Sequence, residues 1–292
     1  MYADHFAELT GEPAWRLEAW RHAEPVEHLR LYRRMFETVP FELRQPELAP
    51  SRELRARLEF VEKAGVPYRH DKRAEEWTPL NVPTRSGHPV DYTVNEHQTV
   101  FDKAAVATHV KIGTAEQALA AGVNDYLDAT VAALGKTEFI LSGGIVGPVY
   151  LCHAYVGLTN LLAMMVDKPR FVDYLTAKLM EQALQEIHRL AAAGGDALFL
   201  DDALVTSEVI SLGHYERFAL PYTTALVNEI HRVGHQALLL YYGGIADRLQ
   251  QLASTGADGL IMETPMKSYT REGWEHTEVE VRGTSPAGVQ QT

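Results

Sequence analysis

Acidic side chains close two apolar runs that have similar surroundings. The run at 194–202, "GGDALFLDD", ends in Asp201 and Asp202, and the run at 255–264, "TGADGLIMET", reaches Glu263 near its end. A carboxyl group at the carboxyl end of a parallel strand can orient N–H groups of a ligand or exchange a proton with it. We therefore take these three acids as candidate functional residues. The alternative is that they are solvated strand ends or helix caps.

Two more apolar runs, "FILSGG" and "QALLLYYGG", precede stretches with helical spacing, so that strand-like and helix-like segments alternate from Phe139 onward. Strands that alternate with helices form right-handed βαβ units around a parallel sheet. Such a sheet brings the carboxyl ends of its strands to one edge, where the candidate acids stand. The sequence therefore predicts an α/β protein with a parallel sheet.

The helices that separate these strands can also be placed. We predict one helix over 114–135 with Thr114 as its N-cap, because a threonine there precedes an apolar-periodic stretch. A long helical region over 157–193 is predicted to split at Pro169, since proline suits the first turn of a helix. A third helical stretch is expected at 207–234.

The chain is divided into three regions. Residues 1–76 carry apolar residues at helical spacing and are predicted to form a helical segment. Residues 77–267 are predicted to form the α/β part, which begins with irregular strands and loops at 77–111. Residues 268–292 are polar and are predicted to be an irregular or disordered tail.

The composition excludes several classes of protein. No window approaches a run of about eighteen apolar residues, and the first residues lack the basic and apolar regions of a signal peptide, so we expect a cytoplasmic protein without a membrane segment. The net charge of −12 argues against binding to nucleic acid. Cys152 is the only cysteine, which excludes an intrachain disulfide and a Cys-rich metal site.

Between Phe139 and Lys267 the chain resembles the uroporphyrinogen decarboxylase superfamily, which contains the haem-pathway decarboxylase and the corrinoid-dependent methyltransferases. The matching segments are, in order, "GGIVGP", "MMVDKPRFVDYLTAKLMEQ", "AGGDALFLDDALVTSEVIS", "HYERFALPYTTALVNEIHRVGH" and "YYGGIADRLQQLASTGADGLIMET". This resemblance implies a TIM-type (β/α)₈ barrel that binds a tetrapyrrole or a methyl-group carrier at its carboxyl-terminal mouth. Within "GGIVGP", Gly144 and Gly147 are then candidate substrate-binding residues.

In the methyltransferase branch the strand that matches 236–242 ends in His-x-Cys-Gly, whose imidazole and thiolate hold a zinc ion. Here those two positions are Leu240 and Tyr242, followed by Gly243, and Cys152 cannot replace the pair alone. We therefore expect no metal site. The decarboxylase branch needs neither metal nor cofactor, and we expect none.

Tyr242 is then expected to face the barrel mouth, with Leu240 beneath it and Tyr241 pointing toward the helices. Its phenol could donate a hydrogen bond to a carboxylate or stack on a macrocycle; the alternative is an aromatic plug of the barrel core. Gly243 and Gly244 allow close approach to the following helix N-terminus, whose free N–H groups favour an anionic group, or they form only a tight turn.

Three features of the decarboxylase branch can be compared with this chain: the arginine-rich opening, an aspartate and a pocket tyrosine. The arginine-rich opening is not recognisable in residues 1–76. Asp91 and Asp102 are stand-ins for the family aspartate that orients pyrrole N–H groups, and a surface position is the alternative for each. Tyr155 matches a tyrosine of the decarboxylase pocket within one residue of the expected spacing, and we take it as a substrate-binding candidate.

The end of the chain does not fit a closed barrel. Four strands are predicted between 139 and 264 and at most two upstream, and the segment after "METPMK" offers only the weak run "VEVRG". We expect a barrel without its last one or two βα units. We hypothesise that the chain is a truncated copy of a longer enzyme, in which residues 268–292 are not family sequence. Unpaired strand edges invite association, and a homodimer is left open.

The sequence therefore predicts an enzyme that removes carboxylate side chains of a tetrapyrrole as carbon dioxide. Asp201, Asp202 and Tyr242 are the expected catalytic residues, and the expected substrate-binding residues are Tyr155, Gly144, Gly147, Gly243 and Glu263. Two alternatives remain. One is a corrinoid-dependent methyltransferase without the usual zinc ligands, and the other is a non-catalytic tetrapyrrole-binding protein.

Overall fold

The computed structural model describes residues 5–39, 43–80 and 100–262. Contacts divide the chain into two compact units. The first unit comprises Met1–Thr93 and Glu116–Leu141, and the second comprises Val94–Ala115 and Ser142–Thr292. The division at residues 76 and 267 that the sequence suggests stays a prediction, and the tail at 268–292 lies outside the described residues.

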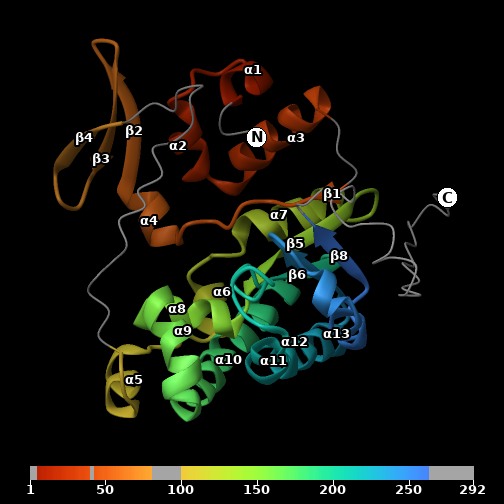
Figure 1. Cartoon of the computed structure of the whole chain (residues 1–292). Helices are drawn as coiled ribbons and strands as arrows, with labels where there is room; N and C mark the ends of the chain where they lie inside the picture. Colours follow the sequence, from red (N-terminus) through yellow and green to blue (C-terminus); the bar gives the residue numbers. More distant parts are fainter. Residues whose placement is uncertain (1–4, 40–42, 81–99, 263–292) are drawn as a thin grey trace. The chain divides into compact units, whose positions relative to one another are not determined.

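A curled parallel sheet forms the centre of the second unit (Figure 1). Its strands are β5 (Phe139–Val146), β6 (Ala197–Asp201), β7 (Gln236–Tyr241) and β8 (Gly259–Met262), in that spatial order. The first residues of β5, up to Leu141, are counted with the first unit. The register pairs Asp201 with Leu240 and Tyr241 with Met262. In the first unit, β1 (Leu43–Arg44) pairs in parallel with the first residues of β5. The predicted α/β class is confirmed. Within the described residues the parallel sheet forms half of a barrel.

Helix α5 (Lys103–His109) precedes the strands of the second unit, and the other helices of this unit follow them. These are α8 (Pro148–Val156), α9 (Leu158–Asp167), α10 (Pro169–Ala191), α11 (Leu212–Phe218), α12 (Leu220–Arg232), the short 3₁₀ helix η1 (Ala246–Arg248) and α13 (Leu249–Ser254). Pro169 opens α10, as predicted, because its fixed φ suits a first helical residue. Helix α10 buries Leu175, Leu179 and Ala183, which recur every fourth residue on one face.

Two predicted helices differ from the observed ones. The stretch 114–135 is not one helix but α6 (Ala115–Ala120) and α7 (Asp125–Leu134), because Gly122 has a φ of +81° that a helix does not allow. Helix α11 begins later than predicted, at Leu212, where the Ser211 hydroxyl accepts a hydrogen bond from the His214 amide and caps the first turn.

The first unit has an aromatic core. Helices α1 (Phe6–Thr10), α2 (Arg16–Arg21) and α3 (Pro25–Thr38) bury a cluster made of Phe6, Leu17, Trp20, Leu31, Tyr32 and Met35. The His28 ring stacks between Trp20 and Tyr126, with ring centroids 4.2 and 3.6 Å away. Burial lowers the pKa of His28 to about 4, so this side chain is neutral at pH 7 and serves as a core aromatic.

Residues 58–79 correct the expectation of a wholly helical N-terminal region. Helix α4 (Arg52–Arg57) ends before β2 (Leu58–Lys63), and β3 (Val66–Asp71) and β4 (Glu76–Pro79) complete a three-stranded antiparallel sheet. The helical spacing of apolar residues in the sequence over 1–76 suggested a helix here as well. The Ala64–Gly65 turn, whose φ angles are +50° and +79°, instead reverses the chain into a hairpin. Helix α5 likewise replaces the loops expected near 103–109.

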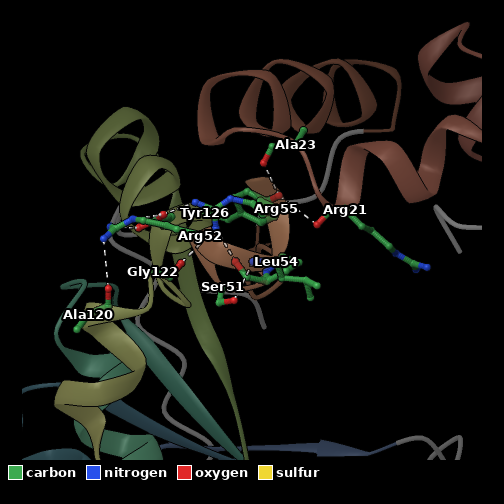
Figure 2. A network of polar contacts seen from close by, with 11 residues as sticks. Arg21, Ala23, Ser51, Arg52, Leu54, Arg55, Ala120, Gly122 and Tyr126 are labelled. Carbon is green, nitrogen blue, oxygen red and sulfur yellow. Dashed lines mark hydrogen bonds and ion pairs between the residues drawn. The ribbon is translucent and has the colours of Figure 1, made fainter. Parts of the chain in front are cut away.

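A polar network joins distant segments of the first unit (Figure 2). The Arg55 guanidinium is buried and donates to the Pro50 carbonyl at 2.6 Å, to the Gly122 carbonyl at 3.4 Å and to the Asp125 carboxylate. Arg52 donates to the same carboxylate at 2.9 Å. Burial acts to raise the pKa of Asp125, but the two arginines outweigh it and leave that pKa below its usual value.

No single helix among the described residues has the length and apolar composition to cross a membrane. Helices α8 and α9 reach this length and apolar composition only when taken together, and the pair is bent by 108°.

We predict that Asp125→Ala destabilises the protein by about 3 kcal/mol, because it leaves the buried Arg55 charge without its carboxylate. Urea unfolding measures this. The matched control is Asp128→Ala, one turn along α7, where burial raises the pKa of the carboxyl. A loss for Asp128→Ala as large as that for Asp125→Ala would contradict the role given to the arginine pair.

Candidate functional site

Backbone hydrogen bonds join the carboxyl ends of three strands of the second unit. The Gly147 amide, just after β5, donates to the Asp201 carbonyl at 2.8 Å, and the Asp202 amide, just after β6, donates to the Leu240 carbonyl of β7 at 3.4 Å. These bonds gather the predicted residues of "GGIVGP", the two aspartates and the end of β7 at one edge of the sheet. This edge is the candidate site.

The two faces of the sheet have different surroundings. Leu198 and Leu200 on β6, with Leu239 and Tyr241 on β7, are buried on the face that α10 and α12 contact. The alternate residues, which are Phe199, Asp201, Leu238 and Leu240, are only half-buried. Because side chains alternate along a strand, the second set lies together on the open face.

Asp201 ends β6 on this open face. One of its carboxyl oxygens accepts a hydrogen bond from the Ala203 amide at 3.3 Å. Burial raises the pKa of Asp201 above its ordinary value, and the Ala203 hydrogen bond opposes this only in part. The carboxyl group is thus reachable, held in place and able to take up a proton more readily than a surface aspartate.

Asp202 points to the other face, into the helix layer. Its side chain is 3% exposed, one oxygen accepts a hydrogen bond from the Thr223 hydroxyl of α12 at 3.2 Å, and the other has no hydrogen-bond partner. Burial raises the pKa of Asp202 to about 7, and the nearby Asp201 charge adds to this. Consecutive residues at a strand end point in opposite directions, so the structure separates the two acids that the sequence grouped.

Other buried polar groups belong to the same side as Asp202. The Cys152 thiol of α8 contacts the Thr176 hydroxyl at 3.4 Å, and burial raises the pKa of this thiol to about 12. Tyr215 of α11 and Tyr241 are buried, and burial raises the pKa of Tyr215 to about 12. These side chains pack behind the sheet and do not reach its open face.

Two predicted glycines permit close packing. A Cβ at Gly144 would lie 2.3 Å from the Phe199 ring, and a Cβ at Gly147 would lie 2.2 Å from the Asp202 carboxyl. Both positions therefore need glycine for packing reasons. Their role in substrate binding stays a prediction.

The glycines after β7 already have an anionic partner. The Gly244 amide donates to both carboxylate oxygens of Glu208 at 2.8 Å, and the Ser207 amide donates to the Gly244 carbonyl at 2.9 Å. The Gly244 hydrogen bond is the main reason why the pKa of Glu208 is lowered. Gly243 has a φ of +111°, which favours glycine. The anion at this turn is thus a side chain of the chain itself. Sequence reasoning did not find Glu208, because it placed this residue in the helical stretch 207–234, whereas the helix begins only at Leu212.

The tyrosines differ in accessibility. Tyr242 is 39% exposed at the end of β7, whereas Tyr241 is 1% exposed on the helix side. Tyr155 is half-buried on α8. Asp102 is an exposed cap of α5, where its carboxylate accepts a hydrogen bond from the Ala105 amide at 2.8 Å, and this supports the surface alternative. Glu263 and Asp91 lie outside the described residues.

The described residues contain no group of three or more His, Cys, Asp or Glu side chains that could hold a metal ion. At the end of β7, Leu240 and Tyr242 offer neither an imidazole nor a thiolate, and the buried thiol of Cys152 lies behind the sheet. This donor set does not fit the zinc of the methyltransferase branch.

The family model described as "Uroporphyrinogen decarboxylase (URO-D)" matches residues 80–281. The chain belongs to this family. The match includes β5–β8 and every residue of the candidate site. It also continues past Lys267, so the hypothesis that all of 268–292 is foreign to the family is wrong for 268–281.

Two known proteins are similar to this URO-D family chain. The uroporphyrinogen decarboxylase of Tolumonas auensis is 31% identical over 105 residues, which is 35% of this chain and only 29% of that protein. A methyltransferase from Methanosarcina mazei has a similar structure, with a TM-score of 0.57, 15% identity, and coverage of 92% of this chain and 70% of that chain. At this identity the second similarity shows the fold alone.

We predict that Gly144→Ala destabilises the protein by about 1–3 kcal/mol, because the new Cβ overlaps the Phe199 ring. The control is Gly213→Ala on α11, where a Cβ meets no atom within 4 Å and alanine favours the helix. Thermal unfolding of both variants measures the difference. Equal Tm changes would show that Gly144 is not needed for this packing.

We predict that Asp202 makes stability depend on pH. Between about pH 4, where aspartate ionises in an unfolded chain, and about pH 7, the folded state holds a proton on Asp202 that the unfolded state has released. The free energy of unfolding therefore falls as the pH rises through this window, by up to about 1.4 kcal/mol per pH unit, and levels off above it.

Urea unfolding at about pH 5 and about pH 8 tests this for the wild type and for Asp202→Asn, which removes the titrating group. The expected result is a smaller loss of stability between the two pH values in the variant. Asp167→Asn is the control, because Asp167 is exposed at the end of α9, away from Asp202. A pH dependence for Asp202→Asn equal to that of the wild type would contradict the prediction.

Proposed function

We propose that this URO-D family chain is an enzyme that acts on a tetrapyrrole and removes its carboxylate side chains as carbon dioxide. The observation that carries the proposal is the position of Asp201. It places a reachable carboxyl group with a raised pKa at the carboxyl end of β6, within the part of the chain that the family model matches. Functional residues of α/β barrels lie at this end of the strands.

The surroundings of Asp201 suit a flat, largely apolar ring. Phe199, Leu238 and Leu240 are half-buried on the same face, and such apolar surface favours contact with a macrocycle. The exposed Tyr242 stands two residues after Leu240, the register partner of Asp201, so it lies toward the same face. A phenol in this position can donate a hydrogen bond to a carboxylate side chain of the ligand.

In the proposed reaction a pyrrole ring is first protonated. The bond between the side-chain methylene and its carboxylate then breaks, carbon dioxide leaves, and the bonding electron pair enters the ring system. A proton on the methylene carbon and loss of the ring proton complete the conversion of an acetate to a methyl group, so that one proton is consumed overall. Asp201 would orient the N–H groups and hold a proton near the ring, which its raised pKa favours. Because Asp202 is buried on the other face, its proposed contribution is indirect.

The alternative of methyl transfer has one observation in its favour, which is the structural similarity to a methyltransferase. The residues at the end of β7 do not supply the zinc ligands that this chemistry uses in the family. We therefore keep corrinoid-dependent methyl transfer, and tetrapyrrole binding without catalysis, as outcomes of the test.

We predict that uroporphyrin raises the Tm of the wild-type chain and that cobalamin does not, because a ligand that binds only the folded state stabilises it. Asp201→Asn is expected to keep this Tm shift and to convert uroporphyrinogen at least about 100-fold more slowly, since an amide cannot exchange the proton. Chromatography of the product porphyrins measures turnover.

The matched control is Asp196→Asn, the same change at the residue before β6, away from the carboxyl end of the strand. It should leave turnover unchanged. A Tm shift with cobalamin alone would support methyl transfer. Binding of uroporphyrin without turnover in the wild type would support a non-catalytic protein, and full activity of Asp201→Asn would remove the role given to Asp201.

A further inference from the structure

A buried arginine lies under the loop that follows β6. Arg248, at the end of η1, is 0% exposed. Its guanidinium donates to the Ile210 carbonyl at 2.9 Å and to the Val205 carbonyl, and it pairs with Asp247 at 2.9 Å. Its carbon Cζ lies 5.1 Å from the centroid of the Tyr215 ring. All the carbonyl acceptors named here come from one segment, residues 202–211, which we call the β6–α11 loop.

This arrangement constrains the loop. A buried guanidinium is costly to remove from water unless its N–H groups find acceptors, so conformations that bring both carbonyls to Arg248 are strongly favoured. Val205 and Ile210 stand on either side of the loop residues Thr206–Val209. Arg248 therefore fixes the two ends of this short segment.

The fixed segment carries the residues that meet the end of β7. Ser207 donates its amide to the Gly244 carbonyl, and Glu208 accepts the Gly244 amide with both carboxylate oxygens. A Cβ at Gly244 would lie 2.4 Å from the Ser207 hydroxyl, so this contact is close. The loop is thus joined at its tip to the turn that directly follows Tyr242.

We propose that Arg248 is a positioning residue of the site: it holds the β6–α11 loop so that the Glu208 carboxylate stays on Gly244, beside Tyr242. In naming a tetrapyrrole as the ligand, this inference rests on the proposed function. The consequence for recognition is that the Gly243–Gly244 turn does not offer its Gly244 amide to a ligand carboxylate. Glu208 instead adds a negative charge at the edge that carries Asp201, and this charge favours the N–H centre of a tetrapyrrole over its acidic rim.

Amide hydrogen exchange tests the positioning role without any ligand. In Arg248→Met, the amides of Ser207 and Gly244 are expected to exchange at least about tenfold faster relative to the β7 amides of Leu238 and Leu239, because the loop opens locally. The control is Arg189→Met, which removes another buried arginine that pairs with Glu186 within α10. In this control all four amides should change together.

If Arg248→Met does not fold, Arg248→Lys and Glu208→Gln provide the same comparison. Lysine keeps a charge but lacks the two-pronged donor, and the glutamine side chain weakens only the Gly244 contact. Loop amides that exchange in step with the β7 amides in these variants would overturn the proposal and leave Arg248 as a general stabilising residue.

Titration with uroporphyrin adds a second readout. We expect Arg248→Lys to bind uroporphyrin at least about fivefold more weakly than the wild type, and Arg189→Lys to bind equally well, because only the first change releases the site loop. If the wild type does not bind uroporphyrin, the proposed function fails, and hydrogen exchange alone still decides the positioning role. Unchanged affinity in Arg248→Lys, with binding by the wild type, would overturn the effect on the site.

Discussion

The close approach of Gly147 to the Asp202 carboxyl constrains the carboxyl ends of β5 and β6. Any side chain at position 147 would overlap the carboxyl group, so the end of β5 can approach β6 only with glycine there. The approach allows the Gly147 amide to reach the Asp201 carbonyl. Asp201 is therefore held at the open face by a contact made on the other side of the strand.

The two neighbouring aspartates differ because consecutive residues at a strand end point to opposite faces of the sheet. Asp202 takes the buried position, with the Thr223 hydroxyl as its partner, and its raised pKa reflects the cost of keeping a charge away from water. Asp201 takes the half-buried position, where a ligand can reach it. One acid thus contributes to the shape of the edge and the other is available for chemistry, although both are the same residue type in adjacent positions.

A second set of contacts lies at the carboxyl ends of β6 and β7, between segments that are distant in the sequence. Arg248 lies 43 residues after Val205 and 38 after Ile210 in the sequence, and Gly244 lies 36 after Glu208. These interactions connect the loop after β6 with the turn after β7, so the two segments depend on each other. The first unit shows the same principle, since Arg52 and Arg55 reach Asp125 across 73 and 70 residues.

The sequence by itself determined the alternation of strands and helices around β5–β8 and the presence of acids at the end of β6. These features depend on periodicities of two and of 3.6 residues, which are local and can be read from one segment at a time. Only the tertiary structure decided that Asp202 faces the helices, that Glu208 occupies the Gly244 amide and that Arg248 holds the site loop. It also decided the hairpin at 58–71, where the helical spacing of apolar residues was misleading. The positions of Asp202, Glu208 and Arg248 depend on burial or on a partner distant in the sequence, and neither can be read from the pattern of a single segment. The hairpin depends on the Ala64–Gly65 turn, whose positive φ angles the spacing of apolar residues does not reveal.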